Sequence, residues 1–200
     1  MNDREPQNVI AICDHLPEEN LLEGAALYYT SLQAKLAPVF GPPQIALAVM
    51  PHILNRSRCL TAFKGDRLVG LLGIHDARGT FLAPDYRVML RHYGAVMGMA
   101  RSALLMLLDH TLPPGELYLD GLAVAEPHRG RGIGTALMAA FENQARANGF
   151  KTLSLEVIDA NPRARRLYER LGYEYVATHT MGPFSRLFGF RTTHRMMKVL

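Results

Sequence analysis

The chain is poor in cysteine and in paired metal-ligand spacings, and both features narrow the class of protein. Its two cysteines, Cys13 and Cys59, form neither a CxxC pair nor a zinc-ligand pattern. A disulfide scaffold is therefore not expected, and the cysteines are predicted to be buried free thiols in a reducing compartment. The eight histidines show no H-E-x-x-H or other paired spacing, so we expect no metal site.

A long apolar run and a secretory leader are lacking too. The chain opens with Met-Asn-Asp-Arg-Glu-Pro, which has neither the cationic start nor the apolar run of a secretory signal. The most apolar window, 95–112, contains Arg101 and Asp109. It falls short of the uninterrupted span of about 20 apolar residues that crosses a membrane. These features predict a cytoplasmic protein without a membrane anchor.

Charge is not clustered either. Among 200 residues, 22 Lys and Arg stand against 18 Asp and Glu, a net charge of +4. The basic residues are spread along the chain except at 163–166. A nucleic-acid-binding protein would more often show a basic stripe interleaved with aromatics, so we expect a polyanionic ligand and no nucleic acid. The length and the hydrophobic content of 48% predict one globular domain, residues 1–200.

The hydrophobic periodicity predicts the order of strands and helices. Strands are predicted at 9–13, 59–63, 68–75, 117–124, 152–158, 173–180 and 192–200. Helices are predicted at 21–39, at 44–54, at 135–148 and from Asn161 to Gly172. Residues 76–115 are too many for a simple connection and hold two further helical patterns, at 85–92 and 97–110. This order predicts an α/β sandwich around a central mixed, mostly antiparallel sheet, with a helical insertion before the fourth strand.

A glycine-rich loop lies between the predicted strand 117–124 and the predicted helix 135–148, where residues 129–134 read Arg-Gly-Arg-Gly-Ile-Gly. Alternate glycines leave backbone N–H groups free to converge on a phosphate at the positive end of the helix. The loop matches neither a P-loop nor the G-x-G-x-x-G dinucleotide fingerprint. Its pattern, Arg-x-x-Gly-x-Gly, resembles the pyrophosphate loop of the GNAT N-acetyltransferase superfamily.

A second motif carries the same resemblance. The segment Asn161-Pro-x-Ala-x-x-x-Tyr168-x-x-x-Gly-Tyr is similar to a helix of that superfamily. The resemblance implies that acetyl-CoA lies between the strands 117–124 and 152–158, without a metal. It implies that strand backbone and Asn161 hold the pantetheine arm and that loop amides hold the pyrophosphate. The implied cofactor-binding residues are Leu122, Ala123, Val124, Arg129, Gly130, Arg131, Gly132, Ile133, Gly134, Thr135 and Asn161. A plain helix N-cap explains Asn161 equally well.

Tyr168 is the general-acid candidate that the resemblance implies, because its phenol would point at the coenzyme sulfur. The attack of an amine on a thioester expels a thiolate, and a phenol can hydrogen-bond to that charge or give it a proton. The alternative is a core tyrosine on the apolar face of the same helix.

Asp120 is the candidate general base. Strand alternation predicts that the side chains on one side of strand 117–124 are those of Tyr118, Asp120, Leu122 and Val124. Asp120 is therefore the carboxylate nearest to the expected thioester, with Glu116 as a weaker choice. A structural carboxylate at the strand end is an equal alternative for Asp120.

The resemblance implies an enzyme that transfers an acetyl group from acetyl-CoA to a primary amine by direct attack in a ternary complex. The insertion 76–115 favours an enclosed site and so a small-molecule acceptor. The alternatives are a protein N-terminal or lysine acetyltransferase and, in another class, a non-catalytic acyl-CoA-binding module. A homodimer through the closing strands is left open.

Overall fold

The computed structural model describes residues 9–107 and 112–200. Its strands form a sheet in the order β1-β2-β3-β5-β6-β8-β7, and the short β4 pairs with β3. Within this described part, β5 and β6 are parallel neighbours and the other paired strands are antiparallel. The predicted mixed, mostly antiparallel sheet is thus confirmed. The strands are β1 (Ile10–Cys13), β2 (Cys59–Lys64), β3 (Arg67–Asp76), β4 (Gly79–Thr80), β5 (Glu116–Val124), β6 (Thr152–Ile158), β7 (Glu174–Thr180) and β8 (Thr192–Val199).

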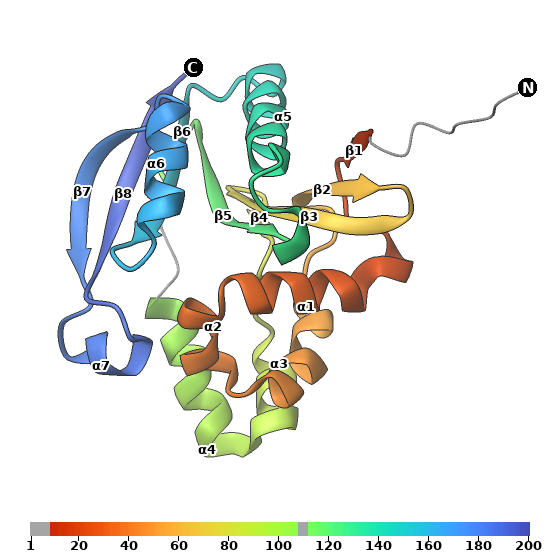
Figure 1. The fold of residues 1–200 in the computed structure, drawn as a ribbon. Helices are drawn as coiled ribbons and strands as arrows, with labels where there is room; N and C mark the ends of the chain where they lie inside the picture. Colours follow the sequence, from red (N-terminus) through yellow and green to blue (C-terminus); the bar gives the residue numbers. More distant parts are fainter. Residues whose placement is uncertain (1–8, 108–111) are drawn as a thin grey trace, which may run out of the picture.

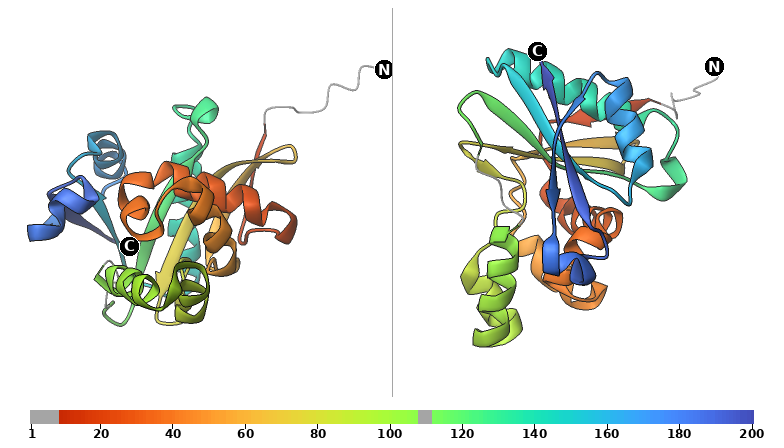
Figure 2. Two further views of the ribbon diagram at one scale, coloured as in Figure 1. Left: turned by 90° about the horizontal axis from the view of Figure 1, so that it is seen from below. Right: turned by 90° about the vertical axis from the view of Figure 1, so that its left-hand side faces the viewer.

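Helices cover the sheet on both sides. Figure 1 shows α5 above the sheet, α6 beside β6 and β8, and α1 to α4 below the sheet, and the second view in Figure 2 separates α5 and α6 from α1 to α4. Each layer has its own apolar core, one beneath α5 and α6 and one against α1 to α4. The helices are α1 (Leu21–Ser31), α2 (Gln33–Phe40), α3 (Pro43–Val49), α4 (Tyr86–Leu107), α5 (Ile133–Ala147), α6 (Pro162–Arg170) and α7 (Ser185–Phe188).

The predicted helix 21–39 is broken at Leu32, between α1 and α2. Leu32 packs against β5 at Gly121, where an added Cβ would meet the Leu32 Cδ1 atom at 2.6 Å. A contact between distant parts of the chain leaves no mark in helical periodicity. The predicted helix 44–54 is also shorter, since α3 ends at Val49 and a 3₁₀ turn follows. Pro51 explains this end, because proline lacks the N–H that would continue the helix.

The two predicted helical patterns of the insertion are present as the two halves of α4, which are separated at Gly94, where the backbone is not helical (φ 75°, ψ 171°). Two contacts anchor α4 to the end of α2: the Tyr93 hydroxyl donates to the Phe40 carbonyl at 2.7 Å, and the Arg101 guanidinium donates to the Val39 carbonyl. The predicted end of the second helical pattern, His110, lies outside the described residues. The two-residue β4 precedes α4, so the strand after the insertion is the fifth and not the fourth.

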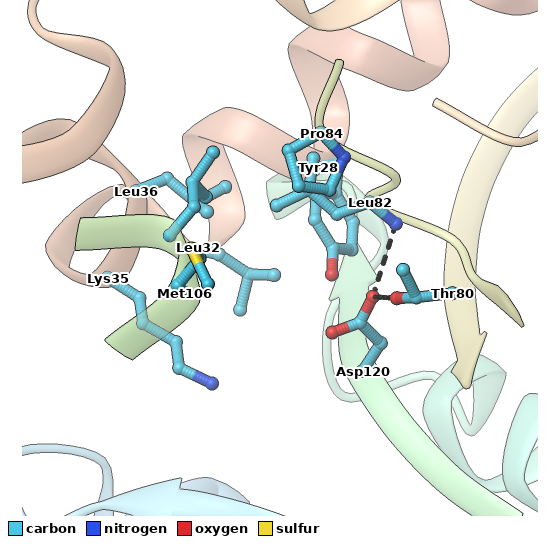
Figure 3. A pocket seen from close by; sticks show the side chains of 10 residues that line it. Tyr28, Leu32, Lys35, Leu36, Thr80, Leu82, Pro84, Met106 and Asp120 are labelled. Atoms are coloured by element: carbon cyan, nitrogen blue, oxygen red, sulfur yellow. Dashed lines mark hydrogen bonds between the residues drawn. The ribbon is translucent and has the colours of Figure 1, made fainter. Parts of the chain in front are cut away.

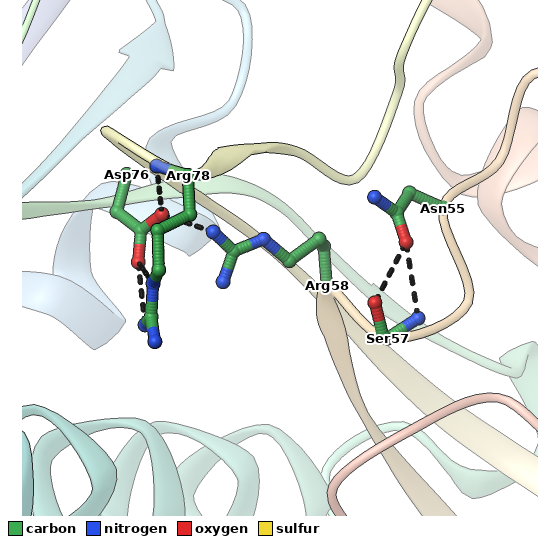
Figure 4. A network of polar contacts seen from close by, with 5 residues as sticks. All are labelled: Asn55, Ser57, Arg58, Asp76 and Arg78. Carbon is green, nitrogen blue, oxygen red and sulfur yellow. Dashed lines mark hydrogen bonds and ion pairs between the residues drawn. The ribbon is translucent and has the colours of Figure 1, made fainter.

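A buried carboxylate fixes the turn between β3 and β4. Both oxygens of Asp76 are bound: Arg78 donates from its backbone N–H at 2.8 Å and from its guanidinium at 2.8 Å, and Arg58 of the segment before β2 forms an ion pair with it (Figure 4). The Asp76 side chain is 1% exposed and that of Arg58 is 12% exposed. This network therefore holds the turn between β3 and β4 against the segment before β2.

We expect Asp76→Asn to lower the free energy of unfolding by about 3 kcal/mol, because it leaves the buried Arg58 without its counter-charge. Burial raises the pKa of Asp76, but the hydrogen bonds and charges of Arg78 and Arg58 outweigh burial, and the pKa lies below its ordinary value. The unfolded chain thus binds this proton at a higher pH than the folded chain does. The difference in stability between wild type and variant should be full at neutral pH and should shrink as the pH falls below 4. Urea denaturation at several pH values measures it, and a difference that does not vary with pH would contradict the assignment.

Candidate functional site

The parallel strands β5 and β6 separate halfway along their length. They pair from Glu116 with Thr152 up to Leu119 with Leu155, and no further pair follows in the described residues. The rest of β5 stays paired with β3 on its other side, up to Val124 with Gly70. Backbone groups of β5 beyond Leu119 therefore face an opening on the side of β6.

A β-bulge lies at the point where the two strands part. Gly73 pairs with Gly121 while the next residue, Ile74, pairs with Leu119, so that Asp120 is an extra residue in β5. The extra residue shifts the alternation of side chains by one position. The prediction that Leu122 and Val124 share a face with Asp120 is therefore wrong. The β5 side chains that pack in the core beneath α5 and α6 are Leu117, Leu119, Leu122 and Val124, whereas Ala123 packs in the other core.

A groove of about 510 Å³ runs from the opening to the glycine-rich loop. Gly130 and Gly132 have φ of 78° and 82°, which glycine adopts without strain, and Gly132 is the N-cap of α5. The first hydrogen bond inside α5 is from the Ala136 N–H to the Gly132 carbonyl, and no described side chain caps this end. The backbone N–H groups of 133–135 are therefore left for a ligand at the positive end of the helix dipole.

Most of the predicted cofactor-binding residues come together in this groove. Those that line it are Leu122, Val124, Arg129, Gly130, Gly132, Ile133, Gly134, Thr135 and Asn161. Ala123 is buried on the other face, and the exposed Arg131 is not part of the lining. The Arg129 Nε atom donates to the Val124 carbonyl at 3.0 Å and so ties the loop to the end of β5.

The N-terminal end of α6 forms the wall of the groove opposite the glycine-rich loop. The Asn161 side chain accepts a hydrogen bond from the Ala164 N–H at 3.1 Å, which confirms its role as N-cap. Arg163 and Arg170 also line the groove, and the Arg163 Nη2 atom lies 3.6 Å from where a Cβ on Gly130 would be. The basic stretch 163–166 thus contributes Arg163 to the groove.

Tyr168 lies behind the groove and does not line it. Its side chain belongs to the core beneath α5 and α6, it is 5% exposed, and its ring lies 6.1 Å from that of Tyr173. Burial raises the pKa of the Tyr168 phenol well above its ordinary value, so this phenol stays protonated at physiological pH. Burial also raises the pKa of Tyr28 and Tyr118, and Tyr168 is among the neighbouring groups that raise both further.

Asp120 lies in a second, smaller pocket between α1, α2, β4 and α4. One of its oxygens, Oδ2, accepts hydrogen bonds from the Thr80 hydroxyl at 2.8 Å and from the Leu82 N–H at 3.2 Å (Figure 3). No described residue donates to the other oxygen, Oδ1. The carboxylate is held in place and keeps one acceptor for a ligand. The pocket is lined by Tyr28, Leu32, Lys35, Leu36, Thr80, Leu82, Pro84, Leu105, Met106 and Asp120.

The other candidate base, Glu116, is engaged elsewhere. It is buried, accepts a hydrogen bond from the Ser154 hydroxyl and forms an ion pair with Arg195 at 2.7 Å. It does not line the groove or the Asp120 pocket. Its contacts describe a structural ion pair between β5 and β8.

The groove and the pocket are lined by residues of the same two elements, α1 and β5. On α1, Ser31 lines the groove while Tyr28 lines the pocket, and on β5, Leu122 lines the groove while Asp120 lines the pocket. The bulge produces this division on β5. Sequence reasoning missed the residues of α1 and α2, because an amphipathic helix shows which face is buried but not what lies opposite to it.

Within residues 9–107 and 112–200, no cluster of three or more His, Cys, Asp or Glu side chains could hold a metal ion. None of the helices described combines the length and the hydropathy of a membrane span.

Comparison with known proteins gave consistent matches. A family model described as "Acetyltransferase (GNAT) family" matches residues 27–173. Of the curated relatives, the uncharacterized N-acetyltransferase YycN of Bacillus subtilis is 37% identical over 62 residues, which are 31% of this chain and 40% of that protein. The acetyltransferase Atu2258 of Agrobacterium fabrum is 38% identical over 79 residues, 40% of this chain and 54% of that protein. The chain thus spans about half or less of the length of these relatives.

Among solved structures, a variant of agmatine N-acetyltransferase in its apo form has the same fold. It matches with a TM-score of 0.60 and 18% identity, over 96% of this chain and 99% of that one.

Proposed function

Because this chain belongs to the GNAT family of acetyltransferases, we propose that it transfers an acetyl group from acetyl-CoA to the primary amine of a small molecule. One observation carries the proposal. A groove that ends at unpaired helix amides and a pocket with a fixed carboxylate both border β5 where it separates from β6.

The groove fits the polyanionic end of acetyl-CoA. The N–H groups of 133–135 would bind the pyrophosphate, and glycines at 130 and 132 allow close approach of the backbone. Arg129 and Arg163 would add positive charge. Along β5, backbone groups at Leu122 would bind the pantetheine arm, whereas the Val124 carbonyl already accepts from Arg129.

Asp120 would act as the general base, and Tyr168 would donate a hydrogen bond to the leaving group. An alkyl ammonium with a pKa of about 10.4 must lose a proton before it can attack, and the Asp120 Oδ1 atom would accept it, directly or through water. The amine nitrogen then bonds to the thioester carbon while the carbon–sulfur bond breaks, and the electron pair leaves on sulfur. The surplus proton on the new amide nitrogen passes, directly or through water, to this thiolate, which is released as the free thiol of coenzyme A. The Tyr168 O–H would donate a hydrogen bond to that thiolate. Its raised pKa favours this donor role over complete loss of the proton.

Direct attack fits the state of the cysteines. Burial raises the pKa of the Cys59 thiol to about 12, so it is not a thiolate at neutral pH and is a poor nucleophile. Cys13 lies on β1 and does not line the groove or the pocket. Because both are free thiols, we also propose a cytoplasmic location.

We further propose that the chain forms one acetyltransferase domain, since one sheet joins β1 to β8. The outer strand β7 exposes Tyr175 and Val176, and we propose it as the interface of a homodimer. Light scattering would reveal a monomer if this assembly is wrong.

Two measurements test the proposed activity. Calorimetry should detect acetyl-CoA binding, and a thiol reagent should detect coenzyme A released when small primary amines are added. Absence of coenzyme binding at high micromolar concentration would refute the proposal. Binding without release for any amine would instead favour a non-catalytic acyl-CoA-binding module.

Tyr168→Phe should lower kcat by about 10-fold or more while the Kd for acetyl-CoA stays unchanged, because only the charged leaving group loses a hydrogen bond. Tyr173→Phe is the matched control. Its hydroxyl is also buried in this core, and it has no hydrogen-bond partner in the described part of the chain. If both variants turn over like the wild type, Tyr168 is a packing residue.

A further inference from the structure

The pocket around Asp120 carries two opposite charges on otherwise apolar or neutral walls. Among the described residues that line it, Asp120 is the anion and Lys35 is the cation. Asp120 comes from β5 and Lys35 from α2, and Figure 3 shows their side chains on different sides of the pocket.

Neither of these two charged side chains forms an ion pair within the described part of the chain. Both hydrogen bonds to Asp120 end on Oδ2, so Oδ1 is open to a ligand. The Lys35 ammonium forms no hydrogen bond or ion pair with a described residue, and its side chain is only half-buried. A pocket with one open acceptor and one open cation is complementary to a ligand that carries an ammonium and a carboxylate.

The remaining walls select an apolar body. They include Leu32, Leu36, Leu82, Leu105 and Met106, and the cavity measures about 100 Å³. The cavity is smaller than the roughly 150 Å³ of a dry cavity that accommodates benzene, so its walls suit a short aliphatic side chain better than an aromatic ring. A polyamine would bring a second ammonium close to Lys35, and the repulsion would disfavour it.

Resting on the proposed acetyl transfer, we propose that the acceptor is an amino acid with an apolar side chain. Its amine lies at Asp120 Oδ1, its carboxylate pairs with the Lys35 ammonium, and its side chain packs against the leucines of α2, of the loop after β4 and of α4. The amine then also lies beside β5 where it separates from β6, near the place that the thioester would occupy.

The first test compares amines on the wild-type protein at saturating acetyl-CoA. Leucine, methionine and phenylalanine are assayed beside isopentylamine, phenethylamine, leucinamide and spermidine. We expect kcat/KM for leucine to exceed that for isopentylamine and for leucinamide by about 10-fold or more, since a partly buried charged hydrogen bond is lost in each case. Equal or better use of isopentylamine, leucinamide or spermidine would overturn the proposal and leave acetyl transfer to amines standing.

The second test changes Lys35. Lys35→Met should raise KM for leucine by about 10-fold with kcat nearly unchanged, and should leave KM for isopentylamine unchanged, because only the carboxylate contact is removed. Lys35→Arg should restore most of the affinity. The exposed Lys151, on the far end of the sheet, gives the matched control Lys151→Met, and acetyl-CoA affinity reports that each variant is folded. An equal effect of Lys35→Met on both amines would overturn the proposal. Failure of the wild type to acetylate any amine would instead refute the proposed function, and acetyl-CoA binding is measured separately.

Discussion

Asp120→Asn is expected to lower kcat by about 100-fold or more, the range in which a general base contributes. The amide keeps an oxygen that can accept from the Leu82 N–H, so the loop after β4 should stay in place. What is lost is the acceptor for the amine proton at Oδ1. The rate at neutral pH then depends on the small fraction of acceptor that is already unprotonated.

This loss has its own pH signature. With a free amine of pKa about 10.4, the variant should gain nearly tenfold in rate per pH unit between 7 and 9, more steeply than the wild type. Acetyl-CoA affinity serves as the control, since Asp120 does not line the groove. A variant with wild-type kcat and an unaltered pH profile would return Asp120 to the role of a structural carboxylate that holds Thr80 and Leu82.

Gly134→Leu should raise the Kd for acetyl-CoA by about 100-fold while the protein remains folded. Gly134 lies in the first turn of α5 without a positive φ. A Cβ there would lie 3.6 Å from methyl groups of Leu122 and Leu167, which is ordinary contact with groove-lining side chains. The larger side chain must therefore occupy the groove. It takes space that the coenzyme needs, and this costs several kcal/mol of binding free energy.

Stability separates this effect from unfolding. Replacing a helical glycine should leave the melting temperature unchanged or raise it, since glycine is disfavoured in helices by about 1 kcal/mol. Gly134→Ala is the graded control and should bind acetyl-CoA nearly as well as the wild type. Wild-type affinity in a folded Gly134→Leu protein would show that the coenzyme binds elsewhere.

Local sequence signals were sufficient where the structure depends on neighbours in the chain. The hairpin of β2 and β3, the glycine end of α5 at Gly149 and the Asn161 cap of α6 follow from turn and cap residues. The glycine-rich loop was predicted as well, although α5 begins at Ile133 and not at Thr135, because Gly132 in the left-handed region already caps the helix.

Sequence signals did not predict the features that depend on tertiary contacts. The bulge at Asp120 arises in the pairing of β5 with β3, and no residue within β5 announces the shifted alternation. At the break between α1 and α2, the Leu32 side chain packs against Gly121, which is 89 positions further along the chain. The pocket joins residues of α1, α2, β4 and α4 to Asp120, and their side chains meet only in the folded chain.

The extra residue in β5 has an evolutionary consequence. It turns Leu122 toward the groove and Asp120 toward the pocket, whereas residues two positions apart in a regular strand face the same side. Under the proposed function, substitutions in α2 or α4 would alter which amine is accepted without disturbing the loop that binds the acyl donor. New substrates could thus be acquired by drift in those helices, while the inherited half of the site is preserved.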